Sequence, residues 1–270
     1  MSERDVIDSS PEPVTHDRIV TDLRRLGVSS GDTLIVHSSL SAIGYVIGGA
    51  QTVVSALLES IGPTGTLTMP GHSGALSEPS YWKDPPVPQA WWPIERATMP
   101  AFDLNLTPLR QMGAIPETFQ RLPGVKRSNH PRLSHLAYGP SASFITNDHA
   151  LVDGLGEQSP LARLYESDAR VLLLGVPHAN NSSLHLAEHR AEWPSKTRTT
   201  QGSPVLVNGR REWVTYDELE TSADDFDAIG AELSANELQT SGLVGFANSL
   251  LMNQRAVVDF AADWMARNRQ

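Results

Sequence analysis

Three ionisable side chains lie within five consecutive positions of the stretch NNSSLHLAEHR, residues 180–190. They are His185, Glu188 and His189. The spacing H-x-x-E-H is that of a zinc-peptidase helix, where two histidines four residues apart ligate the metal and the glutamate acts as general base. This interpretation needs a third protein ligand, which an acidic segment farther along the chain would have to supply.

The same residues also fit a histidine general base that is held by a carboxylate. If a helix starts just before His185, its N-terminus favours a neutral imidazole, which can accept a proton at pH 7. Glu188, one turn later, can accept a hydrogen bond from the other ring nitrogen and fix its orientation. A third interpretation involves no function, with His185 a hydrogen-bonded core residue and Glu188 a surface charge. These residues alone leave all three open.

The segment before this stretch favours the general base over the zinc site. DARVLLLGV, residues 168–176, is the clearest buried strand in the chain, and α/β enzymes place catalytic groups just after such strands. A serine hydrolase is a weaker alternative. PGHSGA, residues 70–75, resembles the nucleophile elbow G-x-S-x-G, but Ala75 replaces the last glycine and the residues that follow cannot form the required helix.

The order of elements near the start of the chain indicates a βαβ unit with a parallel sheet. A helix over residues 17–26 ends at Gly27, and a short strand at Leu34–Val36 stops at HSS, residues 37–39. The helix GGAQTVVSALLESIG and the strand GTLTMP follow. The expected architecture is a layered α/β domain with a mostly parallel or mixed sheet and helices on both faces.

The remaining chain is irregular at first and then regular again. From Gly71 to Pro116 there are eight prolines and three of the six tryptophans, and so long a loop inside a compact domain is usually functional. Later elements are predicted as helices at 116–122 and from 141, a strand at 133–139, a hairpin turning at Asn208-Gly209, and one long amphipathic helix over 243–268.

Composition excludes several classes of protein. The chain has no cysteine, so Cys-ligated zinc and a Cys nucleophile are excluded, and a reducing cytoplasm is the expected location. The formal charge of −10 argues against nucleic acid and anionic membranes as partners. The N-terminal residues are polar, so we expect a disordered lead over residues 1–16 and a single domain over 17–270.

Much of the negative charge lies in one segment that contains no Lys or Arg. It runs from Glu212 to Gln254. Two explanations are equally open. The acidic residues form a solvated helical face, or they form a surface that attracts a cationic substrate. Its nine acidic residues are Glu212, Asp217, Glu218, Glu220, Asp224, Asp225, Asp227, Glu232 and Glu237.

A set of short motifs along nearly the whole chain resembles one known family. In chain order they are VHSSLSAIG, the pair Gly48-Gly49, GTLTMPGHS, MPAFD, MGAIPETFQRLPGVKRSNHP, GEQSP, RVLLLGV and SSLHLAE. From roughly Thr21 to Ala266 the chain resembles the aminoglycoside 3-N-acetyltransferases, also called the antibiotic N-acetyltransferase family. KRSNHP and LHLAE together are the most specific pair.

The resemblance implies a fold and an activity. The fold would be a single α/β/α domain, not the GNAT fold of many other acetyltransferases, whose R/Q-x-x-G-x-G/A phosphate loop is missing from the sequence. The activity would be acetyl transfer from acetyl-coenzyme A as co-substrate, without a metal. The acceptor would be the 3-amino group of the 2-deoxystreptamine ring of an aminoglycoside antibiotic, which gives resistance.

The resemblance also implies roles for individual residues. His185 would be the catalytic base and Glu188 its carboxylate partner. The coenzyme would be contacted by His37, Ser38 and Ser39 along its pantetheine arm, and by Lys126, Arg127, Ser128, His130 and Pro131 from KRSNHP. Lys126 and Arg127 are a basic pair suited to phosphates. Asp103, Asp224 and Asp225 are candidates for binding the amino sugar.

Two segments depart from the family pattern. Gln158 stands where many members have GSP or HSP, and the Trp-rich loop at 81–98 matches no single subfamily. Two alternatives therefore remain beside the aminoglycoside hypothesis: an N-acetyltransferase acting on another small amine, and a non-catalytic binding protein of the same fold. The protein would be a monomer or a homodimer.

Overall fold

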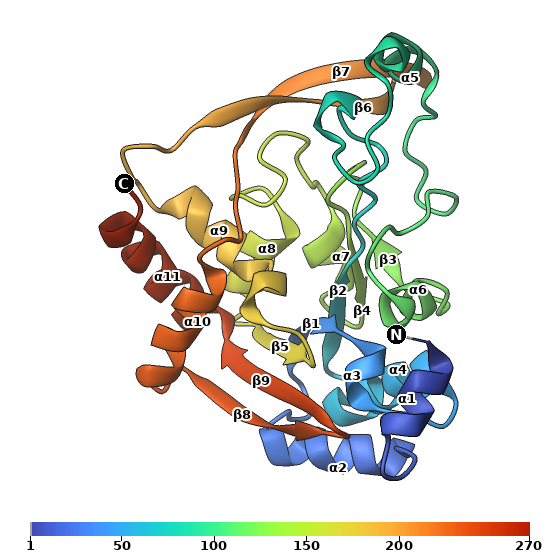
Figure 1. Cartoon of the computed structure of the whole chain (residues 1–270), viewed down its shortest axis with the longest axis vertical. Helices are drawn as coiled ribbons and strands as arrows, with labels where there is room; N and C mark the ends of the chain where they lie inside the picture. Colours follow the sequence, from blue (N-terminus) through green and yellow to red (C-terminus); the bar gives the residue numbers. More distant parts are fainter. Residues whose placement is uncertain (1) are drawn as a thin grey trace.

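The computed structural model describes residues 2–270 and centres on a seven-stranded mixed sheet (Figure 1). The strand order is β3-β4-β2-β1-β5-β9-β8. The strands of this sheet are β1 (Thr33–Ser38), β2 (Thr66–Pro70), β3 (Lys126–Arg127), β4 (His135–Tyr138), β5 (Arg170–Leu174), β8 (Gln239–Val244) and β9 (Ala247–Asn253).

Strands β2, β1 and β5 are parallel and form the middle of the sheet. Their residues are almost all buried, as expected for parallel strands covered by helices on both faces. The register pairs His37 with Leu173 and Ser38 with Leu174. The segments that follow β1 and β5 therefore leave the sheet side by side, at its carboxyl edge.

Antiparallel strands flank this parallel centre and make the sheet mixed. β4 pairs with β2, and β3 pairs with β4. On the other side β9 pairs with β5, and β8 pairs with β9. The expected α/β class with a mixed sheet is confirmed.

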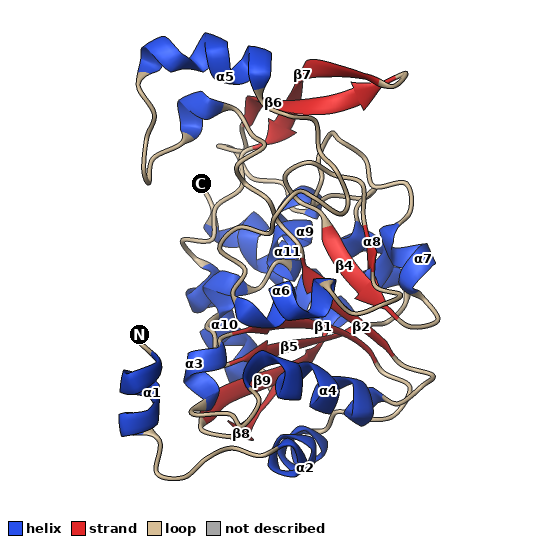
Figure 2. Ribbon diagram, turned by 90° about the vertical axis from the view of Figure 1, so that its right-hand side faces the viewer, coloured by secondary structure: helices blue, strands red, loops and turns tan. Residues whose placement is uncertain are grey.

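Helices cover both faces of the sheet (Figure 2). They are α1 (Glu3–Ser9), α2 (His16–Leu26), α3 (Leu40–Ile43), α4 (Gly49–Ile61), α5 (Trp92–Thr98), α6 (Ala114–Gln120), α7 (Ala142–Thr146), α8 (Pro160–Glu166), α9 (Ser183–Arg190), α10 (Phe226–Ala235) and α11 (Gln254–Asn268). Short 3-10 turns are η1 (Pro79–Tyr81), η2 (Gln89–Trp91) and η3 (His178–Asn180). Between residues 2 and 270, no helix has the length and apolar character needed to span a membrane.

Alternate residues of the central strands point into two separate cores, because successive side chains of a strand face opposite sides. Leu34 and Val36 of β1 pack into the core shared with α2, α4 and α6. Ile35 of β1 and Leu173 of β5 pack into the core shared with α8, α9, α10 and α11. The second core holds the helix with the opening motif, α9, against the sheet.

A two-stranded ribbon stands away from the main sheet. It consists of β6 (Arg198–Val207) and β7 (Arg210–Leu219), and Figure 2 shows it beside α5 at one end of the molecule. The turn is Asn208-Gly209, both with positive φ, as predicted for this hairpin. A small apolar cluster of Leu76, Met99 and Phe102, with Trp82 and Trp213 against it, joins the ribbon to the proline-rich loop.

The predicted long helix over 243–268 is wrong in its first part. β8 ends at Val244, the chain turns at Gly245 with φ +61°, β9 runs to Asn253, and α11 starts only at Gln254. The side chain of Asn253 caps α11 by accepting a hydrogen bond from the N–H of Ala256 at 3.0 Å. β9 forms because the second edge of β5 is buried, and its backbone groups need partners there.

The predicted disordered lead contains a helix. Residue 1 lies outside the described residues. α1 begins with a capping box between Ser2 and Asp5, and the Ser10 hydroxyl accepts a hydrogen bond from the N–H of Tyr45 at 2.8 Å. Val14 is fully buried and pairs with Val46. Polar composition suggested disorder, but capping and one buried anchor order the segment.

Candidate active site

His185 and Glu188 form a hydrogen-bonded pair on α9. The Nδ1 atom of His185 lies 2.5 Å from Oε2 of Glu188. The Glu188 side chain is fully buried, whereas 20% of the His185 side chain is exposed. Since a carboxylate accepts, Nδ1 carries the proton of the neutral imidazole and Nε2 keeps a free lone pair. The exposed basic atom of the pair is therefore Nε2.

The His185 ring has a fixed position for two reasons. Glu188 is one helical turn away and holds one edge of the ring. The ring of Phe226 packs against it, with 4.9 Å between the ring centroids. Leu184, Leu186 and Ala187 are buried and anchor α9 in the core beneath.

The second oxygen of Glu188 is held by residues that sequence analysis did not single out. Oε1 accepts hydrogen bonds from the N–H of Ser222 at 2.9 Å and from Nη1 of Arg269 at 2.7 Å. Arg269 also forms a two-pronged ion pair with Asp225, at 2.7 and 2.6 Å. No local pattern could have found these contacts, because Arg269 lies 81 residues from Glu188.

Buried polar atoms without a hydrogen-bond partner among the described residues gather where β1, β2 and α9 meet this edge of the sheet. They include Nε2 of His37, His72 and His135 and the hydroxyls of Ser38 and Ser183. The rings of His72 and His135 lie 5.4 Å apart. Unpaired buried polar groups are rare and costly, so they are typical of a site where a ligand or water supplies the partner.

Burial keeps these histidines neutral. Desolvation, together with the charges of His135 and His185, lowers the pKa of His37 to about 3. Desolvation lowers the pKa of His135 to about 4. Desolvation also lowers the pKa of His72 well below its ordinary value, and the charges of His135 and His185 add to this. His135 donates from Nδ1 to the carbonyl of Leu133 at 3.1 Å, so its buried Nε2 is an acceptor.

Ser128 and His130 of KRSNHP are engaged within the chain. The Ser128 hydroxyl lies 2.8 Å from Nδ1 of His149 and accepts from the N–H of His135 at 2.8 Å. Nε2 of His149 donates to the carbonyl of Gly154 at 2.7 Å. Nδ1 of His130 accepts from two backbone N–H groups, at 3.1 and 3.0 Å. Pro131 is buried beside them, and the network ties the 128–135 segment to the 149–154 loop.

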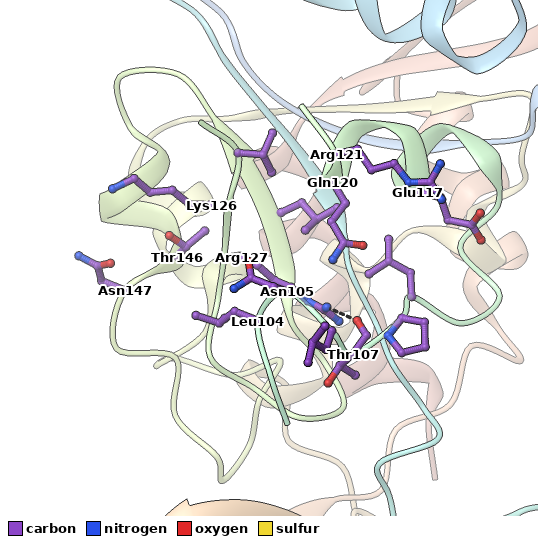
Figure 3. Close-up of a pocket in the computed structure, with 15 residues that line it drawn as sticks. Leu104, Asn105, Thr107, Glu117, Gln120, Arg121, Lys126, Arg127, Thr146 and Asn147 are labelled. Carbon is purple, nitrogen blue, oxygen red and sulfur yellow. Dashed lines mark hydrogen bonds between the residues drawn. The ribbon is translucent and has the colours of Figure 1, made fainter. Parts of the chain in front are cut away.

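Four of the residues predicted to bind the coenzyme line two different pockets on either side of α6. The other four, His37, Ser128, His130 and Pro131, line neither pocket. A pocket of about 760 Å³ is lined by Ser38 and Ser39 at the end of β1, by Gly48 and Gly49 at the start of α4, and by residues 111–115. A second pocket of about 790 Å³ is lined by Lys126, Arg127, Gln120 and Arg121 (Figure 3). The structure thus does not bring the basic pair into the pocket of the HSS segment.

Arg121 also lines the second pocket. The basic pair Lys126 and Arg127 differ in how many hydrogen bonds they make within the chain. The guanidinium of Arg127 donates to the Ser134 hydroxyl at 2.9 Å, to the carbonyl of Thr107 at 2.5 Å and to the carbonyl of Gly71 at 3.0 Å. Figure 3 shows the bond to Thr107. Desolvation lowers the pKa of Arg127 to about 10. Lys126 is exposed and donates only to the Ser143 hydroxyl, at 2.7 Å.

The three aspartates predicted to bind the amino sugar also differ. Asp103 accepts from the N–H groups of Asn105 and Leu106, both at 2.8 Å, within its own turn. Asp225 is paired with Arg269. Asp224 is exposed next to it.

His185 and His189 share a face of α9, as the zinc interpretation requires, but Nδ1 of His185 is bonded to Glu188. Over residues 2–270, no three His, Asp or Glu side chains are arranged to hold a metal ion. His189 lines a separate pocket of about 570 Å³ with Asp153, Lys196 and Arg198.

Comparison with known proteins gives one consistent family. Residues 35–266 match the family model described as aminoglycoside 3-N-acetyltransferase. The chain is 44% identical to the aminoglycoside N(3')-acetyltransferase-like protein YokD of Bacillus subtilis, over 97% of this chain and 96% of that protein. It is 38% identical to aminoglycoside N(3)-acetyltransferase VIII of Streptomyces fradiae, over 98% and 96%.

Solved structures agree with this similarity. The YokD crystal structure superposes with a TM-score of 0.95 at 43% identity, covering 98% of each chain. AAC-IIIb in a binary complex with CoASH gives a TM-score of 0.85 at 32% identity, over 94% of this chain and 97% of that one. AAC-VIa bound to sisomicin gives 0.86 at 31% identity, over 96% and 100%.

We predict that stability falls in mild acid because the buried histidines stay neutral in the folded state. Desolvation lowers the pKa values of His37, His135 and His149 to about 3, 4 and 3, whereas the unfolded chain binds these protons near pH 6.5. The contribution of these histidines to the free energy of unfolding is therefore fully present above pH 6.5. Below pH 6.5 the free energy of unfolding declines, by about 1.4 kcal/mol per pH unit for each histidine. Urea denaturation between pH 7.5 and 5.0 measures this.

The variant His149→Gln provides the internal control. As the pH is lowered, the free energy of unfolding of this variant should fall less steeply than that of the unmodified protein. The two slopes should differ by about 1.4 kcal/mol per pH unit, since one titrating group is missing. A free energy of unfolding that is flat between pH 6.5 and 5.0 in the unmodified protein would contradict the prediction.

Proposed function

Because the chain belongs to the aminoglycoside 3-N-acetyltransferase family, we propose that it transfers an acetyl group from acetyl-coenzyme A to the 3-amino group of the 2-deoxystreptamine ring of an aminoglycoside, which gives resistance. The family is one of acyltransferases. The observation that carries the proposal is the pair His185–Glu188, with Nε2 of His185 free at the carboxyl edge of the sheet. A basic nitrogen in this position suits the removal of a proton from an attacking amine.

His185 acts on the amine and Glu188 acts on His185. Nε2 takes a proton from the acceptor amine as its nitrogen forms a bond to the thioester carbonyl carbon. Glu188, at 2.5 Å from Nδ1, stabilises the imidazolium that results. As the carbon–sulfur bond breaks, the same proton can return to the leaving thiolate, so the transfer needs no acyl-enzyme.

The thioester oxygen becomes negative during the attack and needs a hydrogen-bond donor. The backbone N–H of Ser183 is already used, because it donates to Oδ1 of Asn181 at 3.1 Å. The hydroxyls of Ser183 and Ser38 are buried and unpartnered among the described residues. These hydroxyls are therefore better candidates than the Ser183 amide.

The pocket of about 760 Å³ next to the HSS segment is the proposed place for the coenzyme arm. Ser38 and Ser39 line it and adjoin His37 at the end of β1. It also opens onto the start of α4, whose N-terminus has no capping side chain and carries partial positive charge. The relative AAC-IIIb binds CoASH, which supports the same ligand here.

Asp224 is the proposed contact for a cationic acceptor. It is exposed, and its neighbour Asp225 is held by Arg269 in the network of the catalytic pair. The relative AAC-VIa binds sisomicin. Charge attraction of this kind concentrates a polycationic substrate near the base.

The His185→Ala variant tests the base. Thiol release with acetyl-coenzyme A and a panel of aminoglycosides should fall by about 10²–10⁴-fold, since general-base catalysis is lost. Coenzyme binding should not change, and His189→Ala on the same helix should stay near the unmodified rate. Undiminished thiol release by His185→Ala would exclude His185 as the base. No release with any aminoglycoside, despite coenzyme binding, would favour another amine acceptor or a binding protein.

Two substitutions distinguish the pockets on either side of α6. Ala114→Trp fills the 760 Å³ pocket at an exposed position and should weaken coenzyme A binding by at least about tenfold, measured by calorimetry. Lys126→Ala removes one exposed cation of the other pocket and tests whether Lys126 holds the phosphates. If only Lys126→Ala weakens binding, the coenzyme lies in the pocket of Figure 3 instead.

The salt dependence of the acceptor KM tests the acidic contact. Asp224→Asn should raise the KM for the aminoglycoside and flatten its increase with salt, because one screened attraction is lost. Glu237→Gln, an equal charge change in the same acidic segment, is the control. An identical salt response of Asp224→Asn and the unmodified enzyme would remove Asp224 from the acceptor site.

A further inference from the structure

We propose that Arg269, which follows α11, is a positioning residue for His185 and Glu188 and adjusts the acidity of the pair. This inference rests on the proposed function, since it assumes that His185 is the base. Arg269 would do two things. It would hold the Glu188 carboxylate in the orientation that fixes His185, and it would share the carboxylate charge so that His185 is not kept protonated.

The geometry divides the Glu188 carboxylate between two partners. Oε2 faces Nδ1 of His185 at 2.5 Å, and Oε1 faces Nη1 of Arg269 at 2.7 Å. The N–H of Ser222 is the third donor, at 2.9 Å on Oε1. With both oxygens engaged, the carboxylate cannot rotate away from the imidazole without breaking a charged hydrogen bond.

Arg269 is itself held firmly. Asp225 accepts from its Nε and Nη2 at 2.7 and 2.6 Å, and its Nη2 also donates to the carbonyl of Ser222 at 3.2 Å. The guanidinium carbon lies 5.0 Å from the centre of the Trp193 ring. Its side chain is only 14% exposed, so water screens these contacts weakly.

The charge of Arg269 is permanent over the working pH range. Burial alone would lower the pKa of Arg269, but the hydrogen bonds and charges of Asp225 and Glu188 raise it above its ordinary value. A buried carboxylate with no cation at its other oxygen would favour the imidazolium form of His185, which cannot act as a base. Arg269 reduces this preference for the imidazolium form, while Glu188 still fixes the orientation of the His185 ring.

The arrangement assigns Asp225 a different task from the one that its place in the acidic segment suggested. Its carboxylate neutralises and orients Arg269, so Asp225 acts on Glu188 and His185 only through Arg269. Three segments far apart in the chain meet at this point: α9, the loop at 220–225 and the end of α11. The guanidinium of Arg269, with its five donor hydrogens, links the last of these segments to the other two.

Asp225 loses its partner in a variant of Arg269, whereas the other ionisable groups near the pair keep their contacts. His37, His72 and His189 are the titratable neighbours whose interaction with His185 affects their own pKa values. The charges of Glu188 and Lys196 also act on the pKa of His189, Glu188 raising it and Lys196 lowering it. A change in the pH profile of an Arg269 variant therefore reports the loss of the guanidinium.

The experiment compares Arg269→Met, Arg269→Lys and the control Arg267→Met. Arg267 lies on α11 and contacts the carbonyl of Asp263 rather than Glu188. Arg269→Met should lower kcat by about 10- to 100-fold with the KM for acetyl-coenzyme A unchanged, because the base is misplaced. The acid limb of kcat/KM should move to higher pH by roughly one unit, because the imidazolium is favoured.

The conservative variant separates charge from shape. Arg269→Lys keeps the positive charge but not the two-pronged geometry, so its acid limb should stay near that of the unmodified enzyme while kcat recovers only in part. Arg267→Met should change neither quantity. Melting temperatures show whether each variant is folded, and if Arg269→Met does not fold, the lysine variant carries the test.

A double substitution shows whether Arg269 acts through Glu188. In a Glu188→Gln background, Arg269→Met should lower kcat much less than it does alone, since the effects of coupled residues are not additive. Additive losses, or an Arg269→Met enzyme with unchanged kcat and pH profile, would overturn the inference. If either of these outcomes is found while His185→Ala is inactive in the same assay, only the inference about Arg269 fails, and the proposed function stands. If His185→Ala is active, the proposed function fails first.

Discussion

A carboxylate that is completely buried is costly unless charged and polar donors surround it, and the Glu188 side chain has no exposed surface at all. It is stable because His185, Ser222 and Arg269 each donate a hydrogen bond to it. These donors come from three segments that only the complete fold brings together. The packing of α9, α10 and α11 on one face of the sheet brings these three segments together around this one group.

The carboxyl edge of the sheet imposes a second constraint. β1 and β5 run parallel, so the HSS segment and the segment leading to α9 leave the sheet side by side. β2 brings His72 to the same edge, and the antiparallel partner of β2 brings His135. Burial keeps these imidazoles neutral, so the proposed site combines one exposed basic nitrogen with several uncharged polar atoms. These uncharged polar atoms can contact a ligand without competing with His185 for the proton of the acceptor amine.

The short helix α6 separates the two pockets that the family pattern treated as one coenzyme site. Its N-terminal end lines the pocket of Ser38 and Ser39, and its other end lines the pocket of Lys126 and Arg127. Arg127 stabilises the loop at Thr107 and Gly71 with its own donors. A basic pair in an acidic chain suggested phosphate binding, but half of the pair is used to hold the fold together.

The amino-acid sequence by itself determined the features that depend on local pattern. Apolar runs predicted β1, β2 and β5, and the Asn208-Gly209 pair predicted the ribbon turn. The spacing of His185 and Glu188 allowed the hydrogen bond that the structure contains. These succeed because strand and helix periodicity, turn dihedrals and contacts one turn apart are properties of neighbouring residues. Only the tertiary structure decided the partner of Asp225, the bonds of Arg127 and the break between β9 and α11. Each of these depends on a buried charge or strand edge whose partner is distant in the chain, and local preference carries no information about it.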